Sequence, residues 1–176
     1  MTEQKPNILL TSESIQIRQF EYDDTKDFIA FMTETESTRF LTFDEAQKTP
    51  AGATELLKLT IDSYNTNEPQ FAYAVDDCTT SKFIGFCGLK PHDKETIEIM
   101  YAIMPAARGK GYATEVAKIL SQYAINQLGY KKVIAPISPE NKISKTVVIK
   151  AGFIDHGLKQ IADDERTIHL FVFEQD

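Results

Sequence analysis

The sequence has few cysteines, no long apolar run and no excess of basic residues, and each absence excludes a class of protein. Only 2 of 176 residues are cysteines, Cys78 and Cys87, which is too few for a disulfide scaffold and lacks metal-ligand spacing. No apolar run approaches the roughly 20 residues that cross a bilayer, and the first residues do not show the pattern of a secretory signal. These features predict a reduced, cytoplasmic protein without a membrane segment.

The charge balance argues against a dedicated nucleic-acid binder, which needs a basic face to neutralise phosphates. The net charge is −7, and it is unevenly distributed. Residues 1–88 contain 15 acidic and 7 basic residues, a net of −8, whereas residues 89–176 contain 11 and 12, a net of +1. An acidic first half would attract cations, and the nearly neutral second half could hold an anion. Alternatively, the asymmetry is only a solvated surface.

The chain shows no repeat, low-complexity tract or linker, so it is expected to form one domain over residues 1–176. Alternating and helical apolar patterns predict the element order β-α-α-β-β-β-α-β-α-β-β. This order indicates an α/β fold in which a mixed sheet of about seven strands is flanked by about four helices. Strands are expected over residues 14–18, 71–75, 83–89, 96–104, 132–137, 153–154 and 167–173, and helices from 23–24 to 32, 49–64, after 108–111 to 128, and 141–151.

The segment with the clearest chemistry is residues 97–114, where a strand ends, RGKG follows and a patterned helix begins. A helix N-terminus has backbone N–H groups without internal partners and a positive dipole end. Glycines let those groups surround an anion, and Arg108 and Lys110 add positive charge beside them. The segment therefore predicts a site for a phosphate or pyrophosphate.

Several kinds of site share this pattern. A nucleotide-triphosphate loop is disfavoured, because another residue occupies the position of its first glycine and Gly-Tyr follows Lys110. A dinucleotide fingerprint begins correctly with Gly109 and Gly111, but Thr114 stands at the third glycine position and the ribose-binding acid is missing. A structural helix start without a ligand is the remaining alternative.

Residues 108–113 (RGKGYA) match the Arg/Gln-x-x-Gly-x-Gly/Ala signature of the GNAT superfamily of acetyl-CoA-dependent N-acetyltransferases. Residues 12–18 (SESIQIR) and 84–89 (IGFCGL) resemble the first and third strands of its ribosomal-protein N-terminal acetyltransferase branch. Residues 141–145 (NKISK) and 150–153 (KAGF) resemble the Asn-x-x-Ser and Lys-x-Gly-Phe block of that branch. The matches occur in family order along nearly the whole chain. Met100 departs from the branch, which usually has glycine there.

The resemblance implies a splayed sheet whose fourth and fifth strands part to admit acetyl-CoA. Residues 1–93 would form mainly the acceptor side and residues 94–176 mainly the acetyl-CoA side. Backbone amides of residues 108–114 would hold the pyrophosphate, and the main chain at Ile103 would pair with the pantetheine arm and polarise the thioester carbonyl. The implied cofactor-binding residues are Ile103, Arg108, Gly109, Lys110, Gly111, Tyr112, Ala113, Thr114, Asn141 and Ser144.

The reaction needs a base, because an ammonium ion has no lone pair with which to attack the thioester, and an acid for the departing thiolate. Glu98 is the predicted base, since it stands between Ile97 and Ile99 on a strand, although alternation leaves its face open. By resemblance Ser144 is the acid, or it only hydrogen-bonds the sulfur or the helix start. Tyr101 is a second candidate acid.

The other reactive side chains indicate no separate site. His92, His156 and His169 share no ligand spacing, so no metal is expected. Tyr112 is expected to cover the cofactor rather than transfer protons. Lys131 and Lys132 begin a strand and are either solvated or close to the adenosine 3′-phosphate.

The sequence thus predicts an N-acetyltransferase that moves the acetyl group of acetyl-CoA directly to a primary amine in a ternary complex. Branch resemblance favours a protein or peptide N-terminus as the acceptor, with a polyamine or aminoglycoside as the alternative. A non-catalytic acyl-CoA-binding module is the competing class, because Met100 would narrow the acceptor channel. A monomer or homodimer is expected, without direct nucleic-acid or membrane binding.

Overall fold

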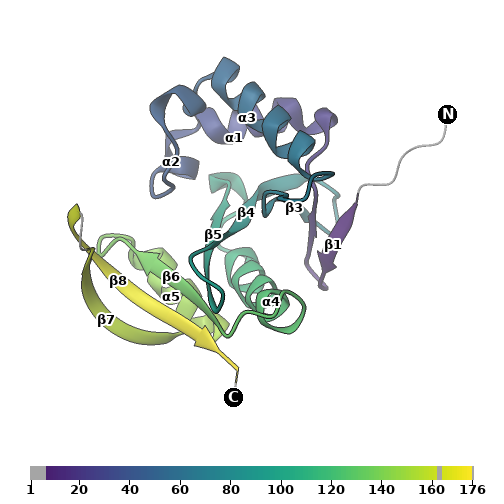
Figure 1. The fold of residues 1–176 in the computed structure, drawn as a ribbon. Coiled ribbons are helices and arrows are strands. Elements are labelled where there is room, and N and C mark those ends of the chain that lie inside the picture. Colours follow the sequence, from purple (N-terminus) through teal and green to yellow (C-terminus); the bar gives the residue numbers. More distant parts are fainter. Residues whose placement is uncertain (1–6, 162–163, 176) are drawn as a thin grey trace. The chain divides into compact units, whose positions relative to one another are not determined.

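The computed structural model describes residues 7–161 and 164–175 of the chain. Within them lie eight strands, five α-helices and three 3-10 helices (Figure 1). In chain order these are β1 (Ile8–Thr11), β2 (Ile15–Arg18), η1 (Tyr22–Asp24), α1 (Thr25–Thr33), α2 (Thr35–Thr38), η2 (Glu45–Lys48), α3 (Pro50–Ser63), β3 (Ala72–Asp77), β4 (Phe83–Pro91), β5 (Thr96–Ile103), η3 (Pro105–Ala107), α4 (Tyr112–Asn126), β6 (Lys132–Ile137), α5 (Lys142–Ala151), β7 (Ile154–Ile161) and β8 (Asp164–Glu174).

The chain divides into two compact units. Unit 1 comprises Met1–Gly88 and Ala102–Tyr112, and unit 2 comprises Leu89–Tyr101 and Ala113–Asp176. Strands β4 and β5 and helix α4 therefore contribute residues to both units.

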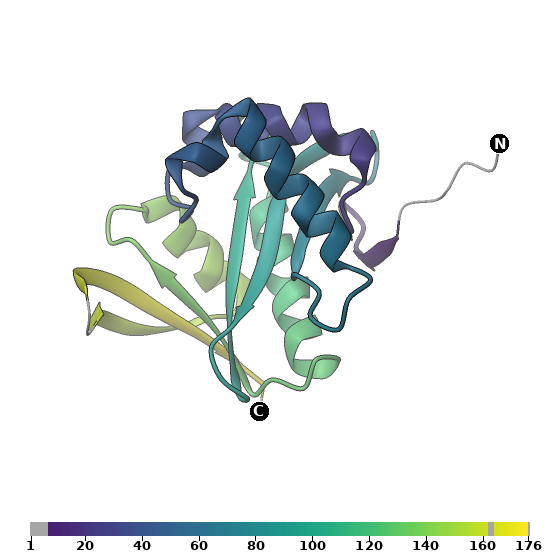
Figure 2. The same cartoon turned by 45° about the horizontal axis from the view of Figure 1, so that its top comes forward.

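Unit 1 contains the strand order β1-β2-β3-β4, with every neighbouring pair antiparallel. The alternation in β2 places Ile15 and Ile17 in the core, and both are fully buried. Helices α1 and α3 lie beside each other over the strands (Figure 2). They meet β3 and β4 in an aromatic core of Phe20, Phe28, Phe31, Met32, Ala53, Leu57, Ala74 and Phe86.

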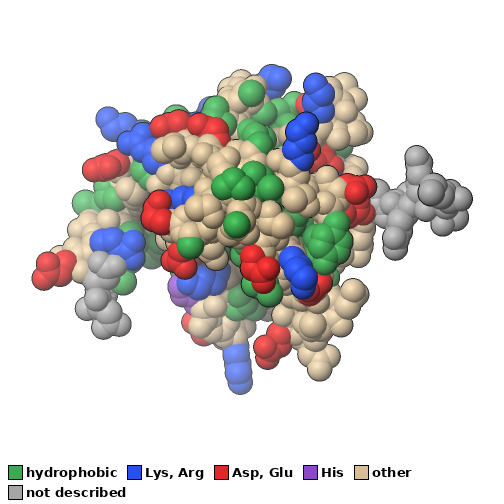
Figure 3. Space-filling view, turned by 90° about the horizontal axis from the view of Figure 1, so that it is seen from above, with side chains coloured by type: hydrophobic (Ala, Val, Ile, Leu, Met, Phe, Trp, Pro, Cys, Tyr) green, Lys and Arg blue, Asp and Glu red, His purple; other side chains and the backbone are tan. Residues whose placement is uncertain are grey.

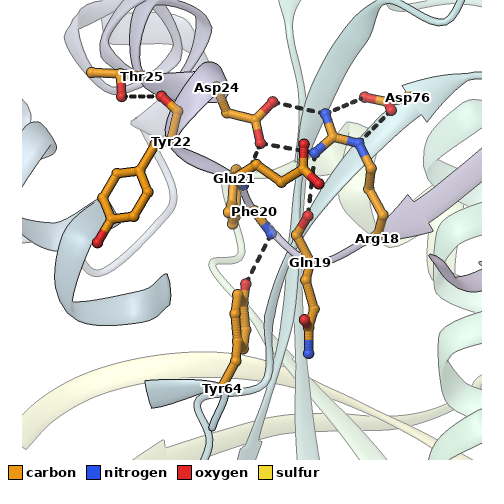
Figure 4. Close-up of polar contacts among 9 residues, drawn as sticks. All are labelled: Arg18, Gln19, Phe20, Glu21, Tyr22, Asp24, Thr25, Tyr64 and Asp76. Atoms are coloured by element: carbon orange, nitrogen blue, oxygen red, sulfur yellow. Dashed lines mark hydrogen bonds and ion pairs between the residues drawn. The ribbon is translucent and has the colours of Figure 1, made fainter. Parts of the chain in front are cut away.

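A buried ion cluster joins β2, β3 and the start of α1 (Figure 4). The Arg18 guanidinium donates to Asp76 Oδ2 at 2.6 Å and to both carboxylate oxygens of Asp24 at 2.8 Å. Asp24 Oδ2 also accepts from the backbone N–H of Glu21 at 2.7 Å. Because one guanidinium serves two carboxylates in a fork geometry, it holds three elements together at once.

Unit 2 contains the strand order β5-β6-β8-β7. Strands β5 and β6 are parallel, and their register runs only from Thr96–Glu98 against Lys132–Ile134. In the part of the chain that the structure describes, this pairing does not extend farther along β5. Strands β6, β8 and β7 are antiparallel, and β7 and β8 form a long curved hairpin (Figure 1).

Helix α5 has a local stop or start signal at each of its ends. The Asn141 side chain accepts from the backbone N–H of Ser144 at 3.2 Å and caps the first turn. The helix ends at Gly152, whose φ of 105° is in the left-handed region that glycine tolerates. These two caps fix where Ser144 stands on its helix.

The predicted α/β fold is confirmed, and the counts of about seven strands and four helices are slightly low. The additional strand is β1, whose four residues ILLT have no period-2 alternation. The additional helix is α2, a single turn too short to show helical periodicity. Among the described residues, no helix combines the length and the apolar character that crossing a membrane requires.

Candidate active site

In unit 1 the loop before α4 exposes backbone donors. Gly109 and Gly111 have φ values of 81° and 82°, which favour glycine, and a Cβ on either would meet nothing within 4 Å. Among the described residues, none accepts a hydrogen bond from the backbone N–H groups of residues 109–111. Unpaired, exposed N–H groups in such a turn bind anions, so the loop fits a phosphate or pyrophosphate.

Arg108 braces this loop through its side chain. Its Nε donates to the carbonyl of Ile103 at 3.0 Å, and its Nη2 donates to the carbonyl of Glu36 in α2 at 2.9 Å. Its backbone N–H donates to the carbonyl of Pro105 at 3.3 Å. Arg108 thus fastens the loop to the end of β5 and to α2, and the free amides begin at Gly109.

The end of β5 is held closely against β4 within unit 1. The backbone N–H of Met104 donates to the carbonyl of Ile84 at 2.8 Å. A Cβ on Gly85 would lie 2.3 Å from the carbonyl oxygen of Ala102, so only glycine permits this approach. The main chain around Ile103 is therefore set in place by β4 on one side and by Arg108 on the other.

Tyr112 closes the loop through an acidic partner that the sequence did not reveal. Its hydroxyl donates to Asp77 Oδ2 at 2.5 Å. Asp77 also accepts from the backbone N–H groups of Thr79 and Thr80 at 2.7 and 3.1 Å. The bond from Tyr112 and these amides lower the pKa of Asp77, and the nearby Lys110 charge adds to the effect. The same bond raises the pKa of Tyr112, so the neutral hydroxyl is retained.

Unit 2 brings Tyr101 and Ser144 together, although 43 positions separate them. The Tyr101 hydroxyl lies 2.7 Å from Ser144 Oγ and 3.5 Å from the Ser144 carbonyl oxygen. Burial raises the pKa of Tyr101 to about 12, while the bond to Ser144 opposes the shift. A tyrosine that stays protonated beside a hydroxyl can donate a proton to an anion.

Glu98 stands apart from this hydroxyl pair. Its neighbours Ile97 and Ile99 are buried, and its own side chain is 20% exposed on the opposite face of β5. Alternation also places Met100, which is half-buried, on the face of Glu98. Glu98 Oε2 lies 2.6 Å from Nε2 of His92, the residue after β4 ends.

The remaining sequence candidates lie apart from these clusters or in the first turn of α4. Ala113 and Thr114 belong to that first turn, in unit 2. Lys131 pairs with Glu95 at the surface. Cys87 is fully buried, and Cys78 is half-buried and contacts the Ser12 carbonyl.

Sequence reasoning missed the partners His92, Asp77 and Glu36. His92 and Glu98 flank the turn of a predicted hairpin, so cross-strand pairing was a usable signal. Asp77 gave no such signal, because its partner Tyr112 is 35 positions away. The Glu36 contact is made by a carbonyl, which every residue has.

Comparison with known proteins identifies the family. The acetyltransferase (GNAT) domain model matches residues 14–154 of the chain. The uncharacterized protein YkkB of Bacillus subtilis is 35% identical over 83 residues, which cover 46% of this chain and 48% of YkkB. The matched segment thus spans about half of that relative.

Two solved structures are similar over most of the chain. One is the ribosomal-protein-S5-alanine acetyltransferase of Vibrio fischeri, with a TM-score of 0.72, 18% identity, and 95% of this chain and 96% of that one covered. The other is the spermidine N-acetyltransferase of Vibrio cholerae in complex with CoA and spermine, with a TM-score of 0.75, 18% identity, and 93% and 97% covered.

At this identity the structural likeness establishes the fold, while the domain match covers most of the sequence and both units. This match confirms the resemblance that the RGKGYA signature indicated. It also confirms that the enzyme class is acyltransferase. The chain belongs to the GNAT family of acetyltransferases.

Proposed function

We propose that the chain is an acetyl-CoA-dependent N-acetyltransferase that moves the acetyl group directly to a primary amine in a ternary complex. The observation that carries the proposal is the loop of residues 109–111, with two positive-φ glycines, open surroundings and unpaired N–H groups. In a GNAT chain this loop fits the pyrophosphate of acetyl-CoA. The two units together form one catalytic domain over residues 1–176 in this proposal.

The other binding roles follow the same assignment. Lys110 supplies positive charge next to the loop amides, and the first turn of α4 with Ala113 and Thr114 adds further donors. The main chain at Ile103 pairs with the pantetheine arm, and Asn141 and Ser144 face the region of the sulfur. Arg108 holds the loop in shape with two of its five guanidinium N–H donors, which leaves further donors for a phosphate.

Acetyl-CoA supplies the activated acetyl group as a thioester. Glu98 accepts a proton from the ammonium form of the acceptor, which frees the lone pair for attack. The Tyr101–Ser144 pair supplies a proton for the departing thiolate. Three residues along a strand span about 10 Å, and Glu98 and Tyr101 lie on opposite faces, so base and acid serve different atoms.

The acceptor in this proposal is a peptide N-terminus first and a small cationic amine second. The similar solved structures include an enzyme named for a ribosomal-protein alanine and one named for spermidine. The net charge of −8 over residues 1–88 favours a cationic acceptor of either kind. Over helices α1 and α3, acidic side chains stand among basic and hydrophobic ones rather than in one patch (Figure 3), so the attraction is long-range.

Calorimetry with acetyl-CoA tests the binding proposal. Gly111→Trp fills the space that the loop leaves for an anion and should abolish measurable binding. Gly129→Trp is the matched control, because Gly129 has the same φ of 82° and equally open surroundings. Equal loss in both variants, or no binding by the wild type, would contradict the proposed cofactor site.

A thiol-release assay across peptides, polyamines and aminoglycosides tests the acceptor and separates the alternatives. Turnover with one amine class and not with hydroxyl acceptors supports the proposal. Acetyl-CoA binding without turnover on any amine would favour the non-catalytic acyl-CoA-binding module, and Met100→Gly then tests whether that side chain blocks the acceptor. Glu98→Gln should lower kcat about 100-fold or more if Glu98 is the base.

A further inference from the structure

His92 and Glu98 form an ion-pairing contact that the proposed reaction does not yet use. His92 Nε2 lies 2.6 Å from Glu98 Oε2, and both residues belong to unit 2. The His92 side chain is 42% exposed and the Glu98 side chain 20% exposed. The other ring nitrogen, Nδ1, has no partner among the described residues. One nitrogen of the His92 imidazole thus faces the Glu98 carboxylate, and the other faces solvent.

Each acetyl transfer leaves one proton on the base, and that proton must depart before the next turnover. Tyr101 cannot take it directly, because Tyr101 lies on the opposite face of β5 and about 10 Å along the strand. Glu98 is hydrogen-bonded to the imidazole of His92. Imidazole changes charge between pH 5 and 8, so it can take up a proton and release it under ordinary conditions.

We infer that His92 is a positioning residue that acts through Glu98. It relays to the solvent the proton that Glu98 takes from the acceptor. This inference rests on the proposed function. The proton removed from the acceptor ammonium goes to Glu98 Oε2, then to His92 Nε2, and the imidazolium loses its Nδ1 proton to water. No electrons are transferred. Of the two protons that the ammonium loses, this one reaches the solvent, and the second, released as the amide forms, replaces through solvent the proton that Tyr101 gives to the thiolate. The relay begins with His92 in the tautomer that carries its proton on Nδ1, because Nε2 must be free to accept the proton from Glu98. Proton exchange with solvent restores this tautomer after each turnover.

The same chain offers a matched control for a purely structural contact. His169 Nε2 lies 2.6 Å from Asp155 Oδ1 in the β7–β8 hairpin. That pair has the same chemistry and distance, but neither residue belongs to the proposed catalytic or binding groups. A variant at His169 therefore removes an equivalent ion pair without touching the relay.

The experiment compares His92→Ala with His169→Ala under saturating acetyl-CoA and acceptor. His92→Ala should lower kcat about tenfold or more with an unchanged KM, and His169→Ala should leave kcat unchanged. Added imidazole should restore the kcat of His92→Ala, whereas 4-nitroimidazole, of similar shape but barely basic, should not. No rescue is expected in the His92→Ala, Glu98→Gln double variant, which lacks the group that passes on the proton.

A second readout needs no turnover. In long-range 1H–15N spectra of the protein without acetyl-CoA, the His92 Nε2 resonance should move on Glu98→Gln and that of His169 should not. Full kcat in His92→Ala, or equal rescue by both azoles, would overturn the relay while the wild type remains an active acetyltransferase. An inactive wild type with an intact His92 signal would instead contradict the proposed function.

Discussion

Arg18→Met provides a quantitative test of the ion cluster in unit 1. The guanidinium makes five hydrogen bonds, four to carboxylate oxygens of Asp24 and Asp76 at 2.6–3.2 Å and one to the Gln19 carbonyl at 3.2 Å. Asp24 and Asp76 are each 7% exposed. Removing the cation leaves two buried carboxylates uncompensated, and breaking such a pair costs about 3–5 kcal/mol. That is a large share of the about 5–15 kcal/mol by which domains are stable.

The pH dependence of this loss has a definite sign. Burial raises the pKa of Asp76, and the neighbouring Arg18 lowers it. Without Arg18, only the influences that raise the pKa of Asp76 remain. In the folded variant Asp76 therefore keeps its proton at pH values at which the unfolded chain has already released it. The free energy of unfolding of Arg18→Met should therefore fall as pH rises above about 4, and its deficit should be smaller at pH 5 than at pH 7.

Urea unfolding followed by far-UV circular dichroism measures the loss. If the two units unfold separately, only the transition of unit 1 should move. Arg18→Lys keeps the charge but not the fork, so it should lose less than Arg18→Met. Adding Asp24→Asn and Asp76→Asn to Arg18→Met should recover part of the stability, because neutral amides replace the two buried carboxylates that the variant leaves uncompensated. A loss below about 1 kcal/mol for Arg18→Met would refute the reasoning.

Two further predictions concern the proposed site. Tyr112→Phe and Asp77→Asn should each weaken acetyl-CoA binding about three- to tenfold in calorimetry, because both break the bond that closes the loop. The lowered pKa of Asp77 means that the bond persists at pH 5 and is lost only below about pH 4, so a binding loss near pH 6 that Asp77→Asn removes would contradict this role. Tyr101→Phe should lower kcat about 10- to 100-fold while leaving acetyl-CoA affinity unchanged, and Ser144→Ala should have the smaller effect. Because the pKa of Tyr101 is raised to about 12, its proton is retained through pH 10, and a fall of kcat centred below pH 10 that vanishes in Tyr101→Phe would disprove its donor role.

Local order along the chain was readable from the sequence by itself. The loop glycines, the apolar spacing of α4, and the Asn141 and Gly152 caps of α5 are encoded by residues a few positions apart. Such signals depend on backbone preferences and on the periodicity of a single element, so they survive without tertiary information. The RGKGYA signature likewise sufficed to assign the family.

Only the tertiary structure decided which side chains become partners. Arg108 reaches the carbonyl of Glu36, 72 positions away, and Tyr101 meets Ser144, 43 positions away. These contacts depend on strand register, on the length of each connection and on the direction of each side chain, none of which a local pattern specifies. The same reason applies to Glu98: alternation separates its face from that of Ile97 and Ile99, but packing decides which of the two faces the core. The sequence thus determines where the reactive groups stand along the chain, and the fold determines which of them can exchange a proton.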